Sequence, residues 1–217
     1  PPVLAAGGDP ATDPVTAAAV DAAVEVLAAG GTVVLPTDTV YGVAAVARRP
    51  EAVAVVFALK ERPDHQPLAV LVADAEQAAE VATPATPAVA RVMTACWPGA
   101  LTLVLPRRTD ARHLDLGGDP ATIGVRCPAS AVARAVVARV GPVATTSANR
   151  HGDPTPHEAA QAAASLAGQV TLVLDGGPCR DRPSTVIDTT TEPWEILREG
   201  PVSRSTIETA RDRLDGG

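Results

Sequence analysis

The chain has 217 residues, of which 46% are hydrophobic and 2% aromatic, and it carries a formal net charge of −7. This length and apolar content suffice for one compact domain whose core is built from Ala, Val and Leu. The acidic balance argues against broad, sequence-independent nucleic-acid binding, which needs a basic surface. No apolar stretch reaches the roughly 18 residues of a membrane helix, and residues 1–14 lack the pattern of a secretion signal, so we expect neither membrane insertion nor secretion.

The cysteines exclude a further class of protein. Cys96, Cys127 and Cys179 are widely spaced and form no CxxC pair. An odd number without close pairs predicts neither a disulfide framework nor a zinc site. A reducing, cytoplasmic location fits this composition.

In chain order, residues 1–12 are expected to form a loose N-terminal arm and residues 13–217 a single domain. Asp13 and Pro14 are typical of an N-cap and a first helical residue, so the first helix is predicted to begin at Pro14. The glycine pair Gly30 and Gly31 is predicted to end it. Apolar runs and alternation predict strands at 32–36, 42–46, 67–72, 100–105, 121–127, 142–146, 170–174, 184–189 and 193–198. Helical periodicity predicts further helices at 50–60, 74–82, 86–96, 128–140, 156–167 and 203–214. Because helices separate many of the strands while other strands follow each other directly, the pattern predicts an α/β fold with a mixed sheet.

The segment "PTDTVYG" (36–42) follows a buried strand and sets out four polar side chains at its end: Thr37, Asp38, Thr39 and Tyr41. A polar turn explains such a segment as well as a ligand-binding loop does. Its meaning therefore depends on what other segments bring to it.

The segment "FALKERPDHQPLAVLV" places two cations at the end of a helix, Lys60 and Arg62, where Pro63 stops it. Cations favour helix C-termini through the helix dipole, and this is the simpler explanation for the pair taken alone. The alternative is an anion clamp, in which Arg62 offers a planar fork to phosphate and Lys60 a point charge.

In "ATIGVRCP", strand alternation puts Thr122, Gly124 and Arg126 on one face. A hydroxyl, a bare backbone position and a guanidinium on one surface suit the close approach of a polar ligand, although a half-exposed strand with a solvated arginine is an equal alternative.

In "PVATTSANRHG", Ser147 and Asn149 follow a short strand in a polar turn, and without a GxSxG motif Ser147 is a poor nucleophile candidate.

Several common devices are missing from the sequence. It contains neither a Walker nor a Rossmann glycine loop, and its four histidines lack metal-binding spacing. A nucleotide would have to be bound without those devices, and no metal site is predicted.

Taken together, the segments resemble the YrdC-like family of threonylcarbamoyl-AMP synthases, which start the threonylcarbamoylation of tRNA adenosine beside the anticodon. The matching segments occur in the family's order over roughly residues 20–200: "PTDTVYG", "LKERPDHQPLAVLV", "WPGALTLVL", "TIGVRCP", "TTSAN", "STVID" and "ILREG". The resemblance implies one YrdC-like catalytic domain, with a twisted mixed sheet and flanking helices around a broad, positively lined cleft.

The resemblance also implies a reaction. L-threonine, bicarbonate or CO2, and ATP condense to threonylcarbamoyl-AMP and pyrophosphate, with Mg²⁺ bound to ATP and no structural metal in the protein. By position in the family's motifs, threonine would contact Thr39, Arg126 and Ser184. ATP would contact Lys60, Arg62, Gln66, Thr122, Ser147, Asn149 and Arg198. Lys60 and Arg62 are the pair to which the resemblance assigns catalysis.

Two positions depart from the family pattern. Gln66 stands where Asn is common, and His157 stands where Thr or Ser is often found, so no ligand role is carried onto His157. The expected partner is a downstream tRNA threonylcarbamoyl transferase, with no stable nucleic-acid binding and no membrane contact.

Two other functions remain open from the sequence. One is a carbamoyl-adenylate-forming domain related to carbamoyltransferases, which would use the same kind of cleft in a multi-domain protein. The other is a non-catalytic RNA-binding protein, against which the acidic charge and the scarcity of stacking aromatics both count.

Overall fold

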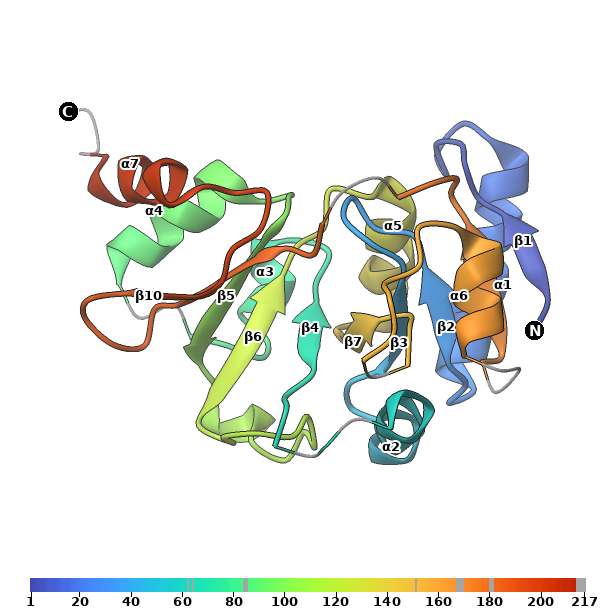
Figure 1. Cartoon of the computed structure of the whole chain (residues 1–217), viewed down its shortest axis with the longest axis horizontal. Coiled ribbons are helices and arrows are strands. Elements are labelled where there is room, and N and C mark those ends of the chain that lie inside the picture. The colour runs from blue at the N-terminus through green and yellow to red at the C-terminus, as the bar shows by residue number, and fades with distance from the viewer. Residues whose placement is uncertain are drawn as a thin grey trace.

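The computed structural model describes residues 1–61, 63, 65–83, 86–150, 152–166, 170–179 and 182–213. Within these residues a ten-stranded mixed sheet runs through the molecule in the order β1-β8-β2-β3-β7-β4-β6-β5-β9-β10, with helices on its faces (Figure 1). The pairs β1–β8, β2–β8, β4–β6 and β5–β9 are parallel, and the remaining neighbours are antiparallel. The prediction of a single α/β domain with a mixed sheet is confirmed.

The strands are β1 (Val3–Ala5), β2 (Val33–Leu35), β3 (Gly42–Val46), β4 (Ala69–Leu71), β5 (Leu101–Pro106), β6 (Thr122–Arg126), β7 (Val143–Ser147), β8 (Leu172–Asp175), β9 (Thr185–Asp188) and β10 (Glu195–Arg198). The helices are α1 (Pro14–Ala28), α2 (Pro50–Lys60), α3 (Ala75–Ala78), α4 (Pro87–Cys96), α5 (Ala131–Val140), α6 (Ala159–Ser165) and α7 (Arg204–Asp212), with a 3-10 turn at Thr109–Ala111.

Local signals explain where the helices begin and end. The Asp13 carboxylate accepts hydrogen bonds from the backbone N–H groups of Val15 and Thr16, as expected of an N-cap. Helix α2 ends at Lys60, and Glu61 then adopts a left-handed conformation with φ of 50°. Helix α3 ends at Ala78 and is shorter than the predicted 74–82, and after a turn Ala82 forms a β-bridge with Arg107.

The N-terminal segment corrects a prediction. Residues Val3–Ala5 form an edge strand parallel to β8, and the Ala6 N–H donates to the Asp175 carbonyl at 2.7 Å. The Gly8 N–H donates to Thr16 Oγ1 at 3.0 Å. A loose arm over residues 1–12 is therefore wrong, because the strand that holds it, β8, lies near the other end of the chain and leaves no local signal.

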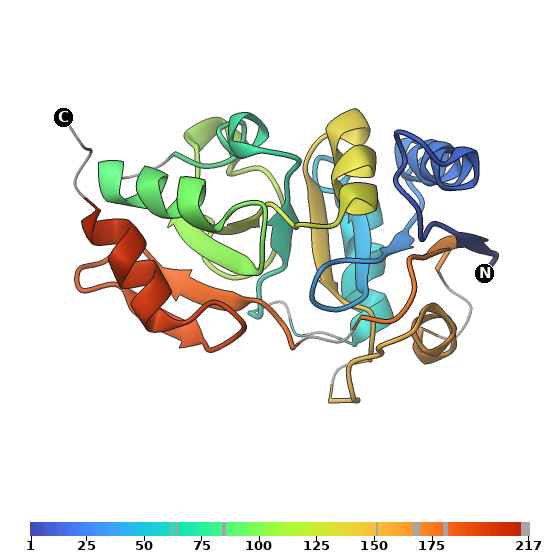
Figure 2. The same cartoon turned by 90° about the horizontal axis from the view of Figure 1, so that it is seen from above.

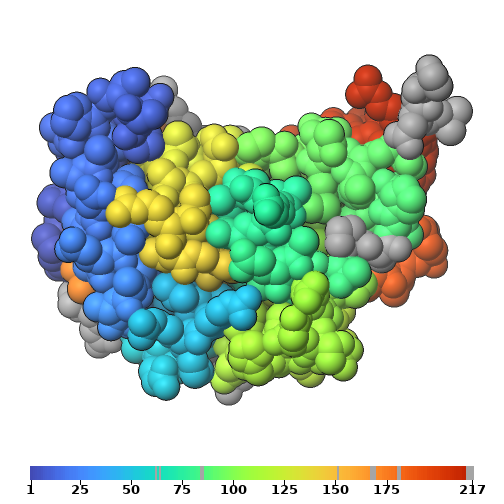
Figure 3. Space-filling view, turned by 180° about the vertical axis from the view of Figure 1, so that it is seen from behind, coloured from blue at the N-terminus to red at the C-terminus, as the bar shows by residue number. Residues whose placement is uncertain are grey.

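The helices form layers on the sheet. Helices α1, α5, α3 and α4 follow one another across the face seen from behind (Figure 3), while α6 lies on the opposite side of the sheet from α1 (Figure 2). At the far end from β1, α7 packs on α4 beside β10. Within the described residues, no helix combines the length and apolar character needed to cross a membrane.

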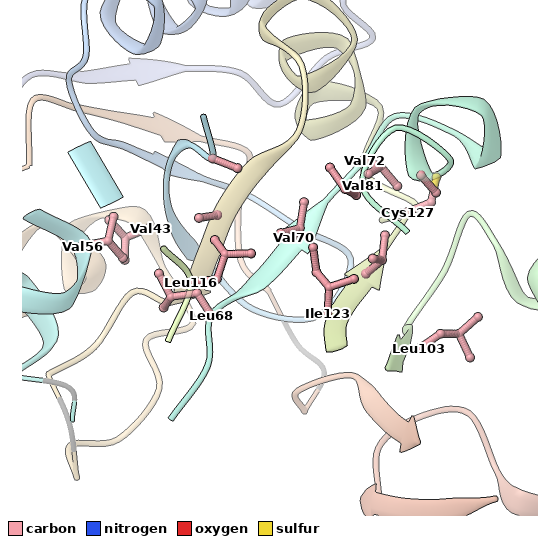
Figure 4. Packing of buried hydrophobic residues seen from close by; sticks show 14 of the residues in the cluster. Val43, Val56, Leu68, Val70, Val72, Val81, Leu103, Leu116, Ile123 and Cys127 are labelled. Atoms are coloured by element: carbon pink, nitrogen blue, oxygen red, sulfur yellow. The ribbon is translucent and has the colours of Figure 1, made fainter. Parts of the chain in front are cut away.

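The larger core cluster holds the central strands in place. Side chains from β3, β4, β5 and β6 meet residues of α2 and of the loop before β6 (Figure 4). On β6, Ile123 and Val125 are buried, while Thr122 and Gly124 are half-buried. The apolar side of β6 therefore anchors the strand, and the opposite side is left for a ligand.

Candidate functional site

A cleft of about 460 Å³ crosses seven neighbouring strands, from β3 through β7, β4, β6, β5 and β9 to β10. The loop between β2 and β3 closes one end of it. Three arginines line the cleft, Arg107, Arg126 and Arg198, and its described lining contains no Asp or Glu.

Seven of the residues predicted for the site line this cleft together: Thr39, Gln66, Thr122, Arg126, Ser147, Ser184 and Arg198. Lys60 and Asn149 are described by the structure but lie beside the cleft and not in its lining. Arg62 lies outside the described residues.

Arg126 is held by several partners at the end of the cleft nearest the β2–β3 loop. Its Nε donates to the Gly99 carbonyl at 3.0 Å, its Nη1 to Thr39 Oγ1 at 2.7 Å and its Nη2 to Asp38 Oδ1 at 2.7 Å. The Asp38 carboxylate also accepts the Ala129 N–H at 2.9 Å. Because the Arg126 side chain is 7% exposed and that of Asp38 19%, this ion pair is shielded from water and fixes the plane of the guanidinium.

The "PTDTVYG" loop is organised by its own side chains. Thr37 Oγ1 accepts the N–H groups of Thr39 and Val40 and donates to the Val40 carbonyl at 2.6 Å. Tyr41 is fully buried beneath the loop, and its hydroxyl donates to the Gly177 carbonyl at 2.6 Å. Burial raises the pKa of Tyr41 far above its ordinary value, and the nearby Asp175 carboxylate adds to the rise. Thr37 thus shapes the loop from within, and Tyr41 supports it from beneath.

Position 42 lacks room for a side chain, which explains why it is a glycine. A Cβ there would lie 2.9 Å from Thr145 Oγ1, and both residues line the cleft. A side chain at Gly42 would push against β7 and fill the cleft mouth.

Ser184 and Arg198 form a second polar group in the cleft. Arg198 donates from Nε to the Ser184 carbonyl at 3.0 Å and from Nη2 to Ser184 Oγ at 3.1 Å. Thr102 Oγ1 shares a hydrogen bond of 2.8 Å with the same hydroxyl. Arg198, Ser184 and Thr102 therefore orient one another on β10, β9 and β5.

Lys60 lies under the turn that follows β7. It is 2% exposed, and its Nζ donates to the Ser147 carbonyl at 2.7 Å and to the carbonyl of Asn149. Asn149 in turn donates from Nδ2 to the carbonyls of Arg150 and Asp153, each at 2.8 Å. In this structure the Lys60 ammonium organises the turn that carries Ser147 into the cleft.

Two residues of this site, Asp38 and Thr102, were not predicted from the sequence as contacts of the ligand-binding side chains. The motifs assign Asp38 no role beyond its place in the "PTDTVYG" segment, and its carboxylate is the partner of Arg126. Thr102 was in a quoted motif without an assigned role, and it contacts Ser184. Alternation along β5 places Thr102 and Val104 on one face, and this signal could have identified Thr102.

The two positions that depart from the family pattern, Gln66 and His157, have different surroundings, and two of the cysteines are buried. Gln66 lines the cleft, whereas His157 lies outside its lining and pairs through Nδ1 with the Cys179 carbonyl at 2.8 Å. Burial raises the pKa of the Cys127 thiol to about 11, and it raises the pKa of Cys179 as well. Both thiols are therefore protonated near neutral pH and are poor nucleophiles.

The sequence also matches a known protein family over most of its length. The sequence model of the Sua5/YciO/YrdC family, described as "Telomere recombination", matches residues 25–200. The chain belongs to this family.

Members of the family include similar proteins of known name. A Bacillus subtilis threonylcarbamoyl-AMP synthase is 36% identical over 178 residues, which cover 81% of this chain and 51% of that protein. A Mycobacterium tuberculosis protein, provisionally given the same name, is 38% identical over 186 residues, which cover 85% of each chain. This chain thus spans about half the length of the Bacillus relative and most of the mycobacterial one.

A solved structure matches as well. Pyrococcus abyssi Sua5 complexed with L-threonine superposes with a TM-score of 0.83 and 35% sequence identity, covering 88% of this chain and 56% of that one. The fold described above is therefore that of a Sua5/YciO/YrdC domain.

Proposed function

We propose that this domain condenses L-threonine, bicarbonate or CO2, and ATP to threonylcarbamoyl-AMP and pyrophosphate. Family membership supports this reaction, as do the names of its relatives and the L-threonine complex of Pyrococcus abyssi Sua5. The observation that carries the proposal is that residues from distant parts of the sequence meet in one cleft. Thr39, Arg126 and Ser184, which the motifs assign to threonine, come from three distant segments and line one cleft with Arg198.

Threonine would occupy the end of the cleft beside the β2–β3 loop. Arg126 suits its carboxylate, because a guanidinium fork pairs with a carboxylate through two parallel hydrogen bonds. Thr39 and Ser184 offer hydroxyls that can donate to, or accept from, the remaining polar groups of the amino acid. The ion pair with Asp38 keeps the fork in one orientation before threonine arrives, which reduces the entropy lost on binding.

The chemistry requires no protein nucleophile. The threonine nitrogen forms a bond to the carbon of CO2 and loses a proton, or reacts with bicarbonate and releases water, to give a carbamate. A carbamate oxygen then forms a bond to the α-phosphorus of ATP, while the bond from that phosphorus to the bridging oxygen breaks and pyrophosphate leaves. The protein's contribution is to position the two substrates and to stabilise the charge that develops on phosphate.

The phosphates would be held from two sides. Arg198 lies beside Ser184, so it can reach a phosphate next to the bound carbamate. Arg62 and the Ser147–Asn149 turn would serve the other phosphates, with Lys60 supporting that turn. Mg²⁺ enters with ATP, whose phosphate oxygens are its preferred ligands. In the described part of the chain, no cluster of three or more His, Cys, Asp or Glu side chains is placed to hold a metal ion.

The product is a reactive mixed anhydride, and it must be consumed by a group transfer. We propose that a tRNA threonylcarbamoyl transferase in the cytoplasm takes the threonylcarbamoyl group to adenosine 37. This would be the first step of tRNA N6-threonylcarbamoyladenosine formation.

The test is to incubate the protein with ATP, Mg²⁺, bicarbonate and single amino acids and to follow pyrophosphate. We expect release that depends on L-threonine and bicarbonate, and its loss in Arg126→Met. Release without any amino acid but with carbamoyl phosphate would instead favour the carbamoyltransferase-related function. RNA binding that is unaffected by ATP and threonine, with no pyrophosphate release, would favour the RNA-binding alternative.

A further inference from the structure

Arg107 is a buried arginine to which the motifs assign no role. It follows β5, it is 5% exposed, and it lines the cleft. Its backbone N–H donates to the Ala121 carbonyl at 2.8 Å, and its β-bridge with Ala82 holds the other side of the chain. The base of the side chain is therefore fixed from two directions.

The guanidinium is partly committed to the protein. Nε donates to the Thr122 carbonyl at 2.9 Å and Nη1 to the Leu114 carbonyl at 2.9 Å. Within the described residues, Nη2 has no hydrogen-bond partner. The buried side-chain atoms that lack a partner in the described residues are Thr32 Oγ1 and Arg134 Nε, so Nη2 of Arg107 keeps some contact with solvent. A donor that is oriented in a cleft wall and still open to the cleft suits a ligand.

The position of Arg107 restricts which part of ATP it can meet. Thr102, at the threonine end, and Arg107 are five residues apart along β5 and its extension, or about 17 Å at 3.4 Å per residue. The α-phosphate must lie near the threonine end, because the carbamate attacks it. The nucleoside is the longer arm of ATP, and therefore the arm that extends toward Arg107.

The lining on this side of the cleft also carries apolar side chains. Val104 of β5 lies between Thr102 and Arg107, Val186 of β9 lies opposite Thr102, and Leu197 of β10 is 54% exposed. A flat purine ring buries its faces well against aliphatic side chains, whereas a triphosphate gains nothing from them. An exposed leucine at the rim of a binding cleft is also the kind of apolar surface that a ligand covers.

We propose that Arg107 recognises the nucleobase of ATP, with Nη2 donating to a ring nitrogen at the edge of the base while Val104, Val186 and Leu197 pack against its face. This inference rests on the proposed function, since it takes ATP as the nucleotide. Arg107 is then a binding residue for the base and takes no part in the chemical step.

The experiment compares Arg107→Met with the wild type, and uses Arg108→Met as the matched control. Arg108 is the next residue, its side chain is 44% exposed and paired with Asp110, and it is not part of the cleft lining. For Arg107→Met we expect the KM for ATP to rise about tenfold, with kcat and the KM for threonine within twofold of the wild type. Arg108→Met should keep wild-type values.

Two inhibitors separate the base from the phosphates. Adenosine should inhibit Arg107→Met about tenfold more weakly than the wild type, and tripolyphosphate should inhibit both equally. Weakened inhibition by tripolyphosphate alone would overturn the proposal by placing Arg107 on a phosphate. Unchanged constants for ATP and adenosine in a stable variant would overturn it too, because they would limit Arg107 to holding the Leu114 and Thr122 carbonyls.

A second variant covers the case in which Arg107→Met does not fold. Leu197→Ala removes an exposed side chain, so it should fold normally while raising the KM for ATP and the inhibition constant of adenosine by a similar severalfold factor. Wild-type constants in Leu197→Ala would contradict the apolar base site. Adenosine binding can also be measured by calorimetry without turnover, so a wild type that binds adenosine but releases no pyrophosphate would refute the proposed function and leave this inference standing.

Discussion

Replacing Asp38 with alanine should weaken threonine binding far more than ATP binding. Asp38 lies outside the set of residues that the motifs assign to threonine, yet it fixes Arg126, the residue proposed to meet the threonine carboxylate. The variant removes the hydrogen bond from Arg126 Nη2 and the one from the Ala129 N–H. Arg126 would keep its bonds to Gly99 and Thr39 but would be free to turn out of the plane in which it is now held.

The geometry sets the size of the effect. A charge-assisted hydrogen bond contributes about 1.5–3 kcal/mol and a neutral one about 1 kcal/mol, so the free energy of unfolding should fall by about 2.5–4 kcal/mol. Losing the orientation of Arg126 should raise the KM for threonine about tenfold, equivalent to about 1.4 kcal/mol. Asp38→Asn keeps an acceptor oxygen at the same place, so it should recover much of both losses.

Steady-state pyrophosphate release gives the KM for each substrate, and thermal unfolding gives the stability. Asp21→Ala is the matched control, because Asp21 pairs with Arg139 at the surface, with 61% and 49% of these side chains exposed. Surface pairs contribute little, so this control should change neither KM nor stability measurably. A normal threonine KM in a folded Asp38→Ala variant would refute the positioning role, and so would equal increases for both substrates.

Three further predictions concern other parts of the site. Lys60→Met, which keeps the buried stem, and Arg62→Ala should each lower turnover by well over tenfold, a barrier change above about 1.4 kcal/mol, as measured by pyrophosphate release. Thr102→Val keeps the shape of the side chain but loses the hydrogen bond to Ser184, so the threonine KM should rise severalfold while the thermal midpoint stays nearly constant. In denaturant titrations above pH 9, wild-type stability should fall more steeply with pH than that of Cys127→Ala, by up to about 1.4 kcal/mol per pH unit.

The sign of the pH effect follows from burial. The Cys127 thiol has a pKa of about 11 in the folded protein and an ordinary value of 9.0, so the unfolded chain loses this proton first as the pH rises. The unfolded state then binds fewer protons than the folded state, and stability falls between pH 9 and about 11. Equal slopes for the wild type and Cys127→Ala would show that burial does not perturb this thiol.

Near-normal turnover in Lys60→Met would refute the proposed role of Lys60 in supporting the phosphate site. An unchanged threonine KM in Thr102→Val would refute the role of Thr102 in orienting Ser184.

Elements with strong local signals were predicted well. Strand β3 and helix α2 have the predicted bounds, 42–46 and 50–60, because glycine and proline mark where they begin and a run rich in apolar residues follows each. Strand β1 was missed because three half-exposed residues carry no period, and its pairing with β8 is a long-range contact. The prediction for helix α3 was too long, because residues after Ala78 form a turn that leads to the bridge between Ala82 and Arg107, which is a contact between distant residues.

The site shows the same division between local and long-range information. Alternation predicted that Thr122, Gly124 and Arg126 share a face, and all three line the cleft. The pairing of Asp38 with Arg126 joins residues 88 positions apart, and the contact of Lys60 with the Ser147 carbonyl joins residues 87 apart. Such contacts follow from sheet topology and leave no trace in the spacing of neighbouring residues.

The most direct test of the proposed function is the mass of the nucleotide product made from L-threonine, ATP, Mg²⁺ and ¹³C-bicarbonate. We predict threonylcarbamoyl-AMP that is heavier by the isotope difference of one carbon, formed together with pyrophosphate. An unlabelled adenylate of threonine itself would mean that the amino-acid carboxylate attacks the α-phosphate without prior carbamate formation. That product, or the absence of any adenylate, would contradict the account.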